Sequence, residues 1–277
     1  MPTKINATTE PVSVPPNSRL SGKRALVTGG SDGIGLAIAE AFAREGAELY
    51  LVGRSTERLA RAQKYLEGAE VKIIAVDLST DAGIDSVVRQ IGEFEKPLDI
   101  VVNNAAVAYF SPFDSVTIDQ FQHSFALNVA APYFLTQRLL PFLTQPGGSV
   151  INISSYFADK MIPNRPSTLY SLSKGAINSL TKSLAYELGK RGIRVNAIAP
   201  GTVDTAMRRA SIENLPAEAQ AELQRFVDRS YPLGRIGQVS DIGGIAVYLA
   251  SNEASWTSGG IFSINGGLTA GGLSKQP

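Results

Sequence analysis

The sequence contains no cysteine and a single histidine, and these two absences exclude several kinds of site. Without cysteine the chain has no disulfide, no thiolate nucleophile and no cysteine-ligated metal. The lone histidine, His123, cannot build a metal site by itself, so we expect it to serve in packing or at the surface. No metal is therefore expected in the function of this chain.

The sequence also has no excess of positive or negative charge and no long run of apolar residues. Charged residues make up 18% of the 277 residues and the net charge is +1. This balance gives no reason to expect nucleic acid or an anionic membrane as a partner. No stretch resembles a signal peptide or a membrane-spanning helix, so the sequence predicts a cytoplasmic protein.

What is present suffices for one large domain, because an apolar share of 44% can fill a complete core. Residues 1–19 hold four prolines and show no periodicity, which predicts a flexible or extended arm. We expect residues 20–277 to form a single domain with no linker and no internal repeat.

From residue 24 onward, short apolar runs alternate with segments of helical periodicity. Parallel neighbours require crossover connections, so this alternation predicts a doubly wound, parallel, seven-stranded sheet of the Rossmann type, in the α/β class. The expected strands are 24–28, 48–52, 71–76, 99–103, 149–154, 194–199 and 261–264. The expected helices are 36–44, 56–66, 82–93, 117–143, 170–190 and 240–250.

A glycine-rich turn, Thr28 to Gly35, lies where the first strand meets the first helix. Bare backbone amides and the positive end of a helix attract a pyrophosphate at such a turn. The spacing is T-G-x-x-x-G-x-G rather than G-x-G-x-x-G, because Asp32 stands where the second pattern needs glycine. With a parallel sheet behind it, the turn predicts a dinucleotide site.

Tyr170 and Lys174 lie one helical turn apart at the start of the 170–190 segment. A nearby ammonium favours the phenolate, so such a tyrosine can exchange a proton with an alcohol or ketone. The same spacing occurs twice more, at Tyr156–Lys160 in a loop-like segment and at Tyr186–Lys190 at the far end of the helix. We expect those two pairs to be ordinary surface or interface residues.

Together these motifs resemble the short-chain dehydrogenase/reductase family over residues 22–268. The resemblance rests on the glycine turn, the Tyr170–Lys174 pair and the further residues Asp77, Asn103-Asn104-Ala105, Asn128, Ser155 and Pro200-Gly201-x-Val203-x-Thr205. It implies Tyr170 as general acid/base, Lys174 as the group that lowers its pKa and holds the nicotinamide ribose, and Ser155 as the donor to the substrate oxygen. It also implies that Asn128 holds a water that connects Lys174 to solvent.

The resemblance further implies a nicotinamide site in which glycine backbone passes close to the pyrophosphate, Asp77 contacts the adenine and Val203 with Thr205 receive the carboxamide. The residues expected to bind the cofactor are Gly29, Ser31, Asp32, Gly33, Ile34, Gly35, Arg54, Asp77, Leu78, Asn104, Ala105, Tyr170, Lys174, Pro200, Gly201, Val203 and Thr205. Two plainer interpretations stay open: Asn128 could bridge backbone groups, and Asp77 could be a turn residue.

Two departures from the family pattern affect the site. Ala106 stands where the family usually has glycine after Asn-Asn-Ala, which narrows the cleft slightly. The stretch before Tyr170 is about two residues longer than usual, so the usual spacing falls on Phe157, which cannot replace a hydroxyl. The catalytic serine is then Ser154 or Ser155, and Ser155 aligns better with the strand end.

The nucleotide is predicted from the end of the second strand, where an NAD site normally offers a carboxylate to the ribose. This chain has Gly53 and Arg54 there, followed by Arg58, and a guanidinium suits a 2′-phosphate. NADP(H) is therefore favoured and NAD(H) remains an alternative, since Asp32 lies in the glycine turn and Arg54 could be a solvated charge.

The resemblance implies an oxidoreductase that transfers a hydride to or from a ketone or secondary alcohol, with a mobile substrate lid around 202–235. Aromatic residues at the strand ends suggest an apolar or aromatic ketone pocket, although such residues also pack loops; they are Tyr109, Phe110, Tyr156 and Phe157, with Met161 beside them. The alternatives are a non-catalytic nucleotide sensor or scaffold on the same fold, and an epimerase or dehydratase. The apolar helices 117–143 and 170–190 predict a homodimer or homotetramer.

Overall fold

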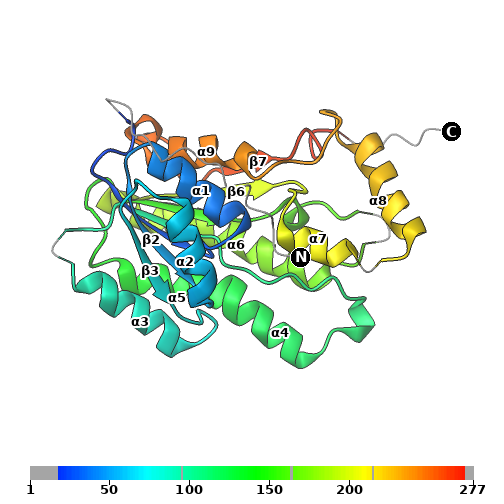
Figure 1. Cartoon of the computed structure of the whole chain (residues 1–277), viewed down its shortest axis with the longest axis horizontal. Helices are drawn as coiled ribbons and strands as arrows, with labels where there is room; N and C mark the ends of the chain where they lie inside the picture. The colour runs from blue at the N-terminus through cyan, green and yellow to red at the C-terminus, as the bar shows by residue number, and fades with distance from the viewer. Residues whose placement is uncertain (1–17, 95, 163–164, 214, 272–277) are drawn as a thin grey trace.

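A computed structural model describes residues 18–94, 96–162, 165–213 and 215–271. In this part of the chain one sheet has the strand order β3-β2-β1-β4-β5-β6-β7, and every neighbouring pair is parallel (Figure 1). The predicted doubly wound, seven-stranded architecture is thereby confirmed. The predicted arm, 1–19, lies almost wholly outside the described residues.

The strands are short and apolar because both faces of the sheet are covered by helices. In β1, for example, Ala25 and Val27 face one core cluster while Leu26 faces the other. The strands are β1 Arg24–Thr28, β2 Glu48–Gly53, β3 Val71–Ala75, β4 Ile100–Asn103, β5 Ser149–Ile153, β6 Arg194–Pro200 and β7 Ile261–Ile264. All seven lie within one residue of the predicted ranges.

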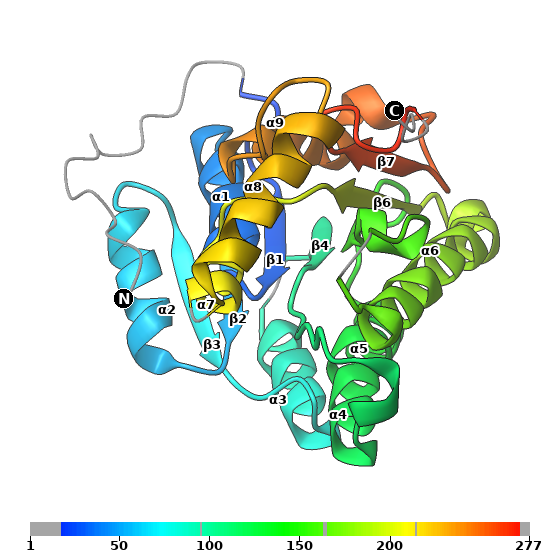
Figure 2. The same cartoon turned by 90° about the vertical axis from the view of Figure 1, so that its right-hand side faces the viewer.

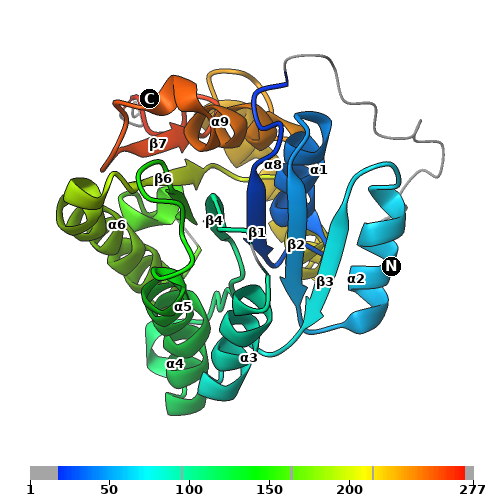
Figure 3. The ribbon, with the colours of Figure 1, turned by 90° about the vertical axis from the view of Figure 1, so that its left-hand side faces the viewer.

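Two helical layers enclose the sheet (Figure 3). One face is covered by α1 Gly33–Arg44, α2 Thr56–Tyr65 and α9 Ser240–Ala250, whose core residues include Ile38, Leu59 and Ile242. The other face is covered by α3 Asp81–Gly92, α5 Ala131–Leu139 and α6 Thr168–Leu188. No helix of the described residues is long and apolar enough to cross a membrane.

The predicted helix 117–143 is interrupted. The structure has α4 Ile118–Phe125, a π-helical turn Ala126–Ala130 and then α5. Pro132 lies in the first turn of α5 and has no N–H to continue the α-helical ladder, which is the local reason for the wider turn. The interruption matters for the site because Asn128 lies in the π-helical turn.

The carboxyl ends of all the parallel strands lie at the same end of the sheet. From β1 the chain first adds strands on one side, β2 and β3, and then crosses to the other side with β4, so the switch point lies between β1 and β4. This switch point is where ligands bind in open α/β sheets. The segment predicted as a lid folds into α7 Ala206–Glu213 and α8 Ala217–Ser230. In Figure 1 these two helices lie beyond one end of the sheet, and Figure 2 views the molecule from that side.

Candidate active site

The glycine turn between β1 and α1 is closely packed, and its glycines have different reasons to be glycine. A Cβ on Gly35 would lie 2.3 Å from the Gly29 carbonyl oxygen, and one on Gly29 would lie 2.7 Å from Asn104 Nδ2. Asn104 Nδ2 donates to the carbonyls of Thr28 and Gly29 at 2.9 and 3.2 Å. Asn104 therefore holds the turn in place from β4.

Gly33 needs glycine for its conformation, since its φ is +56°. A Cβ there would meet only Thr205, at 3.5 Å. Asp32 caps α1 through a bond from the Gly33 amide to its Oδ1 at 2.7 Å. Ser31 lies over the end of β2, where a Cβ on Gly53 would come 3.4 Å from Ser31 Oγ. Within the glycine turn, Gly33 therefore lies against Thr205, and Ser31 lies against the end of β2.

Asp77, predicted to contact the adenine, lies just after β3 and is held in an acceptor role. Burial favours the neutral acid, but the Ser79 hydroxyl and amide donate to Oδ1 at 2.7 and 2.9 Å, and the net pKa is below its ordinary value. Arg54, exposed at the end of β2, contributes to this lowering. The Asp77 side chain therefore stabilises the turn in which it lies, which agrees with the plainer interpretation given above. Its role toward adenine stays a prediction.

Two predicted cofactor residues use their side chains in the core. Leu78 is buried in the cluster under α3, and Ile34, in the first turn of α1, packs against the opposite cluster.

Ser155 lies at the carboxyl end of β5 beside Tyr170 in the first turn of α6. Burial raises the pKa of Tyr170 to about 12, and the neighbouring Ser155 side chain and the positive charge of Arg165 both act to lower it. Of the two candidates for the catalytic serine, Ser154 donates its hydroxyl to Asn178 Oδ1 at 2.6 Å, which favours Ser155 for that role.

Lys174 is almost fully buried, one turn along α6 from Tyr170. Its ammonium donates to the carbonyl oxygen of Ile153 at 2.7 Å and lies 5.7 Å from the centre of the Tyr170 ring. Burial lowers the pKa of Lys174 to about 8. The groups that lower the pKa of Tyr170 are Ser155 and Arg165, so the lowering by Lys174 that the resemblance implies stays a prediction.

The other two tyrosine–lysine pairs do not form comparable arrangements. Lys160 reaches the carbonyl oxygen of Leu268 at 2.6 Å, while Tyr156 is buried among aromatic rings. Tyr186 is 90% exposed on α6, and Lys190 lies in the turn that follows the helix.

Asn128 bridges backbone groups in this structure. Its Oδ1 accepts from the Val107 amide at 2.9 Å, and its Nδ2 donates to the Val107 carbonyl at 2.8 Å and to Ser173 Oγ at 3.1 Å. The π-helical turn thereby fixes the loop after β4 against α6. The water relay implied by the resemblance stays a prediction.

The segment after β6 approaches the glycine turn from the other side. Pro200 ends β6, and a Cβ on Gly201 would lie 2.8 Å from the Asn265 Cα, so glycine is required there for packing. Val203 pairs with Gly237 in an isolated bridge, and Thr205 Oγ1 accepts from the Arg208 amide at the start of α7.

Two contributors to the site, Gly30 and Arg165, were not among the predicted site residues, and Thr28 was predicted only as the first residue of the glycine turn. The Thr28 hydroxyl accepts from the Asn104 and Ala105 amides at 2.8 and 3.0 Å and so ties β1 to β4. A Cβ on Gly30 would lie 2.9 Å from the Leu51 side chain, so glycine is needed there for packing. In the sequence, only its position beside Gly29 pointed to this residue. Arg165 lies beside Tyr170. The sequence feature that could have identified it is that Arg165 is the one charged residue between Lys160 and Lys174.

These residues fit a nicotinamide dinucleotide. The buried Lys174 ammonium carries three N–H donors but has one hydrogen-bond acceptor among the described residues. The remaining donors suit ribose hydroxyls, and the open backbone at Gly33 beside the N-terminus of α1 suits a pyrophosphate.

Comparison with known proteins gives the same assignment over most of the chain. Residues 29–269 match the family model described as enoyl-(acyl carrier protein) reductase. A sorbitol dehydrogenase from Cereibacter sphaeroides is 35% identical, with 90% of this chain and 98% of that protein covered. A short-chain dehydrogenase/reductase from Serratia marcescens has 33% identity and a TM-score of 0.81, with coverage of 91% of this chain and 99% of that one.

A crystal structure of a gluconate 5-dehydrogenase from Burkholderia cenocepacia, in complex with NADP and tartrate, has a TM-score of 0.83 and 28% identity. The match covers 92% of this chain and 98% of that one. Sequence, fold and site geometry agree: the chain belongs to the short-chain dehydrogenase/reductase family.

Proposed function

We propose that Ser155, Tyr170 and Lys174 are the catalytic groups of a nicotinamide-dependent carbonyl reductase or alcohol dehydrogenase. The chain is an oxidoreductase that moves a hydride between a nicotinamide cofactor and an alcohol or ketone, as its family membership shows. The observation that supports these residues most is the placement of Ser155 beside Tyr170, with Lys174 buried one turn behind.

In the reducing direction Tyr170 donates its phenolic proton to the substrate oxygen. A pKa of about 12 keeps that proton on Tyr170 at neutral pH, as a general acid requires. The Ser155 hydroxyl donates to the same oxygen and stabilises the negative charge that develops there. The bound nicotinamide supplies the hydride, and the protein contributes position and field.

We propose NADP(H) as the preferred nucleotide. Arg54 is exposed directly after β2 and just before the N-terminus of α2, where the Ser55 hydroxyl accepts from the Arg58 amide at 3.2 Å, and the preceding Gly53 lies against Ser31. A guanidinium, a hydroxyl and a helix N-terminus together suit a 2′-phosphate. The NADP bound to the related gluconate 5-dehydrogenase supports this choice.

We also propose that α7 and α8 form the substrate lid and that the chain assembles as a homodimer or homotetramer. Large apolar side chains are exposed on α4, α5 and α6; they include Ile118, Phe121, Tyr133, Phe134, Leu172 and Tyr186. The cytoplasmic location stays a prediction from the sequence.

A panel of neutral ketones and secondary alcohols with NADP(H) and NAD(H), followed by nicotinamide absorbance, tests this function. We expect turnover with at least one class and its loss in Tyr170→Phe, by a factor of about 100 or more for removal of a general acid. Nucleotide affinity of this variant, measured by fluorescence, should be nearly unchanged because only the phenolic oxygen is removed.

Tyr186→Phe is the matched control, since it removes the same oxygen from the same helix at an exposed site. Comparable activity in Tyr170→Phe and wild type would show that another group carries the proton.

A further inference from the structure

The guanidinium of Arg165 lies near the rings of Phe110 and Phe157, which also lie near Tyr170, the proposed proton donor. Its guanidinium carbon lies 4.4 Å from the centre of the Phe110 ring and 6.0 Å from that of Phe157. These two rings lie 5.6 and 6.0 Å from the ring of Tyr170. Arg165 and Tyr170 therefore share one aromatic-walled space at the carboxyl end of β5.

The charge of Arg165 has no carboxylate partner in the described part of the chain. No aspartate or glutamate oxygen of those residues lies within 4.0 Å of its guanidinium, although the side chain is half-buried. Burial lowers the pKa of Arg165, and the neighbouring charge of Arg208 lowers it further. Arg208 is itself paired with Asp204 at 3.6 Å, so burial without a carboxylate partner is the main reason that an anion would stabilise Arg165.

A second group points to a ligand at the same place. Tyr156 is 4% exposed and its hydroxyl has no hydrogen-bond partner among the described residues. The Thr202 side chain lies beside it without the geometry of a hydrogen bond. A buried hydroxyl without a partner is costly, and such groups in native proteins call for an explanation. The Tyr156 ring stacks on Phe157 with centroids 4.2 Å apart, and the Phe157 ring also lies 6.0 Å from the Arg165 guanidinium carbon and 6.0 Å from the Tyr170 ring, so the three groups surround one aromatic ring.

We propose that Arg165 and the Tyr156 hydroxyl form an anion-binding subsite that holds a carboxylate of the substrate, so that this enzyme prefers hydroxy acids and oxo acids to their neutral counterparts. The inference rests on the proposed function, in which the reacting oxygen lies at Ser155 and Tyr170.

The chemistry of the subsite fits a carboxylate. A guanidinium binds carboxylate in a bidentate manner, and a phenol adds one donor from the side. The rings of Phe110 and Phe157 would line the carbon chain between the carboxylate and the reacting carbonyl. The aromatic pocket predicted for a ketone thereby acquires a charged end.

Pairs of substrates in which a carboxylate is replaced by a neutral group at the same end of the molecule test the subsite. Levulinate and methyl levulinate are compared in reduction with NADPH, and gluconate and sorbitol in oxidation with NADP+. We expect wild type to favour the acid of each pair, and Arg165→Met to lower kcat/KM for the acid tenfold or more, chiefly through KM. The neutral member should change less than about twofold, because it makes no ionic contact.

Three further variants separate binding from folding. Arg165→Lys should retain part of the preference for the acid, and Tyr156→Phe should lose part of it. Arg89→Met, which removes the same charge from an exposed site on α3, should leave both members of each pair unchanged.

A readout independent of turnover is the rise in Tm that levulinate produces in the NADPH-bound protein, which should be present in wild type and absent in Arg165→Met. Equal losses for acid and ester in Arg165→Met, or a wild type that favours the ester, would overturn the subsite. Turnover of neutral ketones would leave the proposed function standing in that case. Failure of every substrate, with the Tm response intact, would count against the proposed function alone.

Discussion

Arg54 is the single residue on which the choice of nucleotide depends most. It offers a guanidinium where an NAD site offers a carboxylate, and it is exposed directly after Gly53, which lies against Ser31. We expect Arg54→Asp to weaken NADP(H) by about ten- to a hundredfold, because a charge-assisted hydrogen bond contributes about 1.5–3 kcal/mol. Affinity for NAD(H) should hold or improve, since aspartate offers the ribose an acceptor.

The measurement is the ratio of kcat/KM for the two nucleotides with one substrate. Arg61→Asp, at an exposed site on α2, is the control for the change of charge. A wild type that prefers NAD(H), or a ratio that Arg54→Asp leaves unmoved, would mean that Arg54 is only a solvated charge.

Lys174 illustrates a residue whose proposed function opposes stability. Its pKa of about 8 lies below the ordinary 10.5 because burial disfavours the ammonium. We expect Lys174→Met to abolish activity and weaken nucleotide binding, yet to raise the free energy of unfolding at pH 7 by roughly 1–3 kcal/mol, at 1.36 kcal/mol per pKa unit less the lost hydrogen bond.

Between pH 8 and 10.5 the unfolded chain holds more protons at this site than the folded one, so wild-type stability rises with pH. The advantage of the variant should therefore shrink over that range, as urea unfolding without nucleotide would show. Lys182→Met, exposed on α6, is the control and should change stability by less than about 0.5 kcal/mol. Loss of stability in Lys174→Met at pH 7 would contradict this account.

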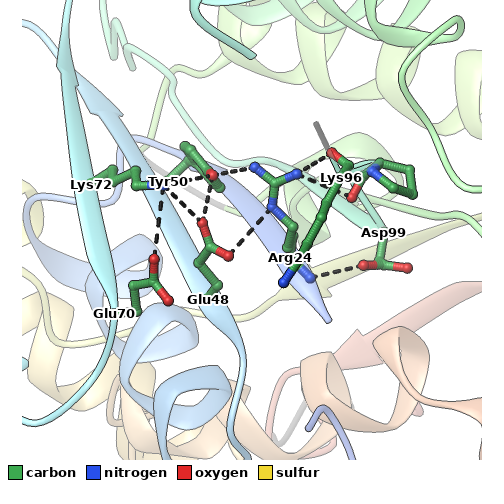
Figure 4. Close-up of polar contacts among 8 residues, drawn as sticks. Arg24, Glu48, Tyr50, Glu70, Lys72, Lys96 and Asp99 are labelled. Atoms are coloured by element: carbon green, nitrogen blue, oxygen red, sulfur yellow. Dashed lines mark hydrogen bonds and ion pairs between the residues drawn. The ribbon is translucent and has the colours of Figure 1, made fainter. Parts of the chain in front are cut away.

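At the scale of the elements, the amino ends of the strands are joined by a polar network opposite the site (Figure 4). Arg24 in β1 is buried and bonds to the Tyr50 hydroxyl and the Lys96 carbonyl, and its Nε lies 3.4 Å from Glu48 Oε2. Lys72 in β3 reaches Glu48 Oε1 at 3.1 Å. Three neighbouring strands are thus connected through one carboxylate.

We expect Arg24→Met to lower the free energy of unfolding by about 2–4 kcal/mol, because removing one partner leaves polar groups buried without compensation. Activity at a permissive temperature should persist, since the network lies at the far end of the strands. Arg44→Met, which breaks an exposed pair with Glu40, should cost less than about 0.5 kcal/mol in the same urea titration.

The network also predicts a pH dependence. Burial tends to raise the pKa of Glu48, but bonds from Tyr50 and Lys72 and the charge of Arg24 bring it below the ordinary value. The stabilisation is therefore complete above the ordinary carboxyl pKa and lost as pH falls through the lower folded value. Glu48→Gln should lose less stability than wild type on acidification. An equal loss in both proteins would assign the acid sensitivity elsewhere.

For the whole molecule, the exposed apolar side chains on α4, α5 and α6 predict self-association. Tyr186 is 90% exposed, and an isologous contact would bring it to a second copy of the same surface. We expect light scattering at micromolar concentration to show a dimer or tetramer, and Tyr186→Glu to shift it toward smaller species. Ala60→Glu, exposed on α2, adds the same charge and should not shift it. A wild-type monomer would refute the assembly.

The sequence by itself determined the fold, the family and the order of the motifs. Continuous apolar strands such as 24–28 and 149–153, separated by helical periods, leave a parallel sheet as the consistent arrangement. The glycine turn and Tyr170 with Lys174 are local patterns, so short-range spacing was enough to find them. The prediction of one helix over 117–143 missed the π-helical turn at Ala126–Ala130, because apolar periodicity does not register such a turn.

Only the tertiary structure decided which groups meet across the chain. It turned Ser154 toward Asn178 and left Ser155 for Tyr170, because hydroxyl directions depend on packing rather than on spacing. It set Asn128 on the Val107 backbone and brought Arg165 beside Phe110, more than fifty residues away. The electrostatic character of the site comes from burial and neighbours, and both exist only once the sheet and its helices have closed around Tyr170.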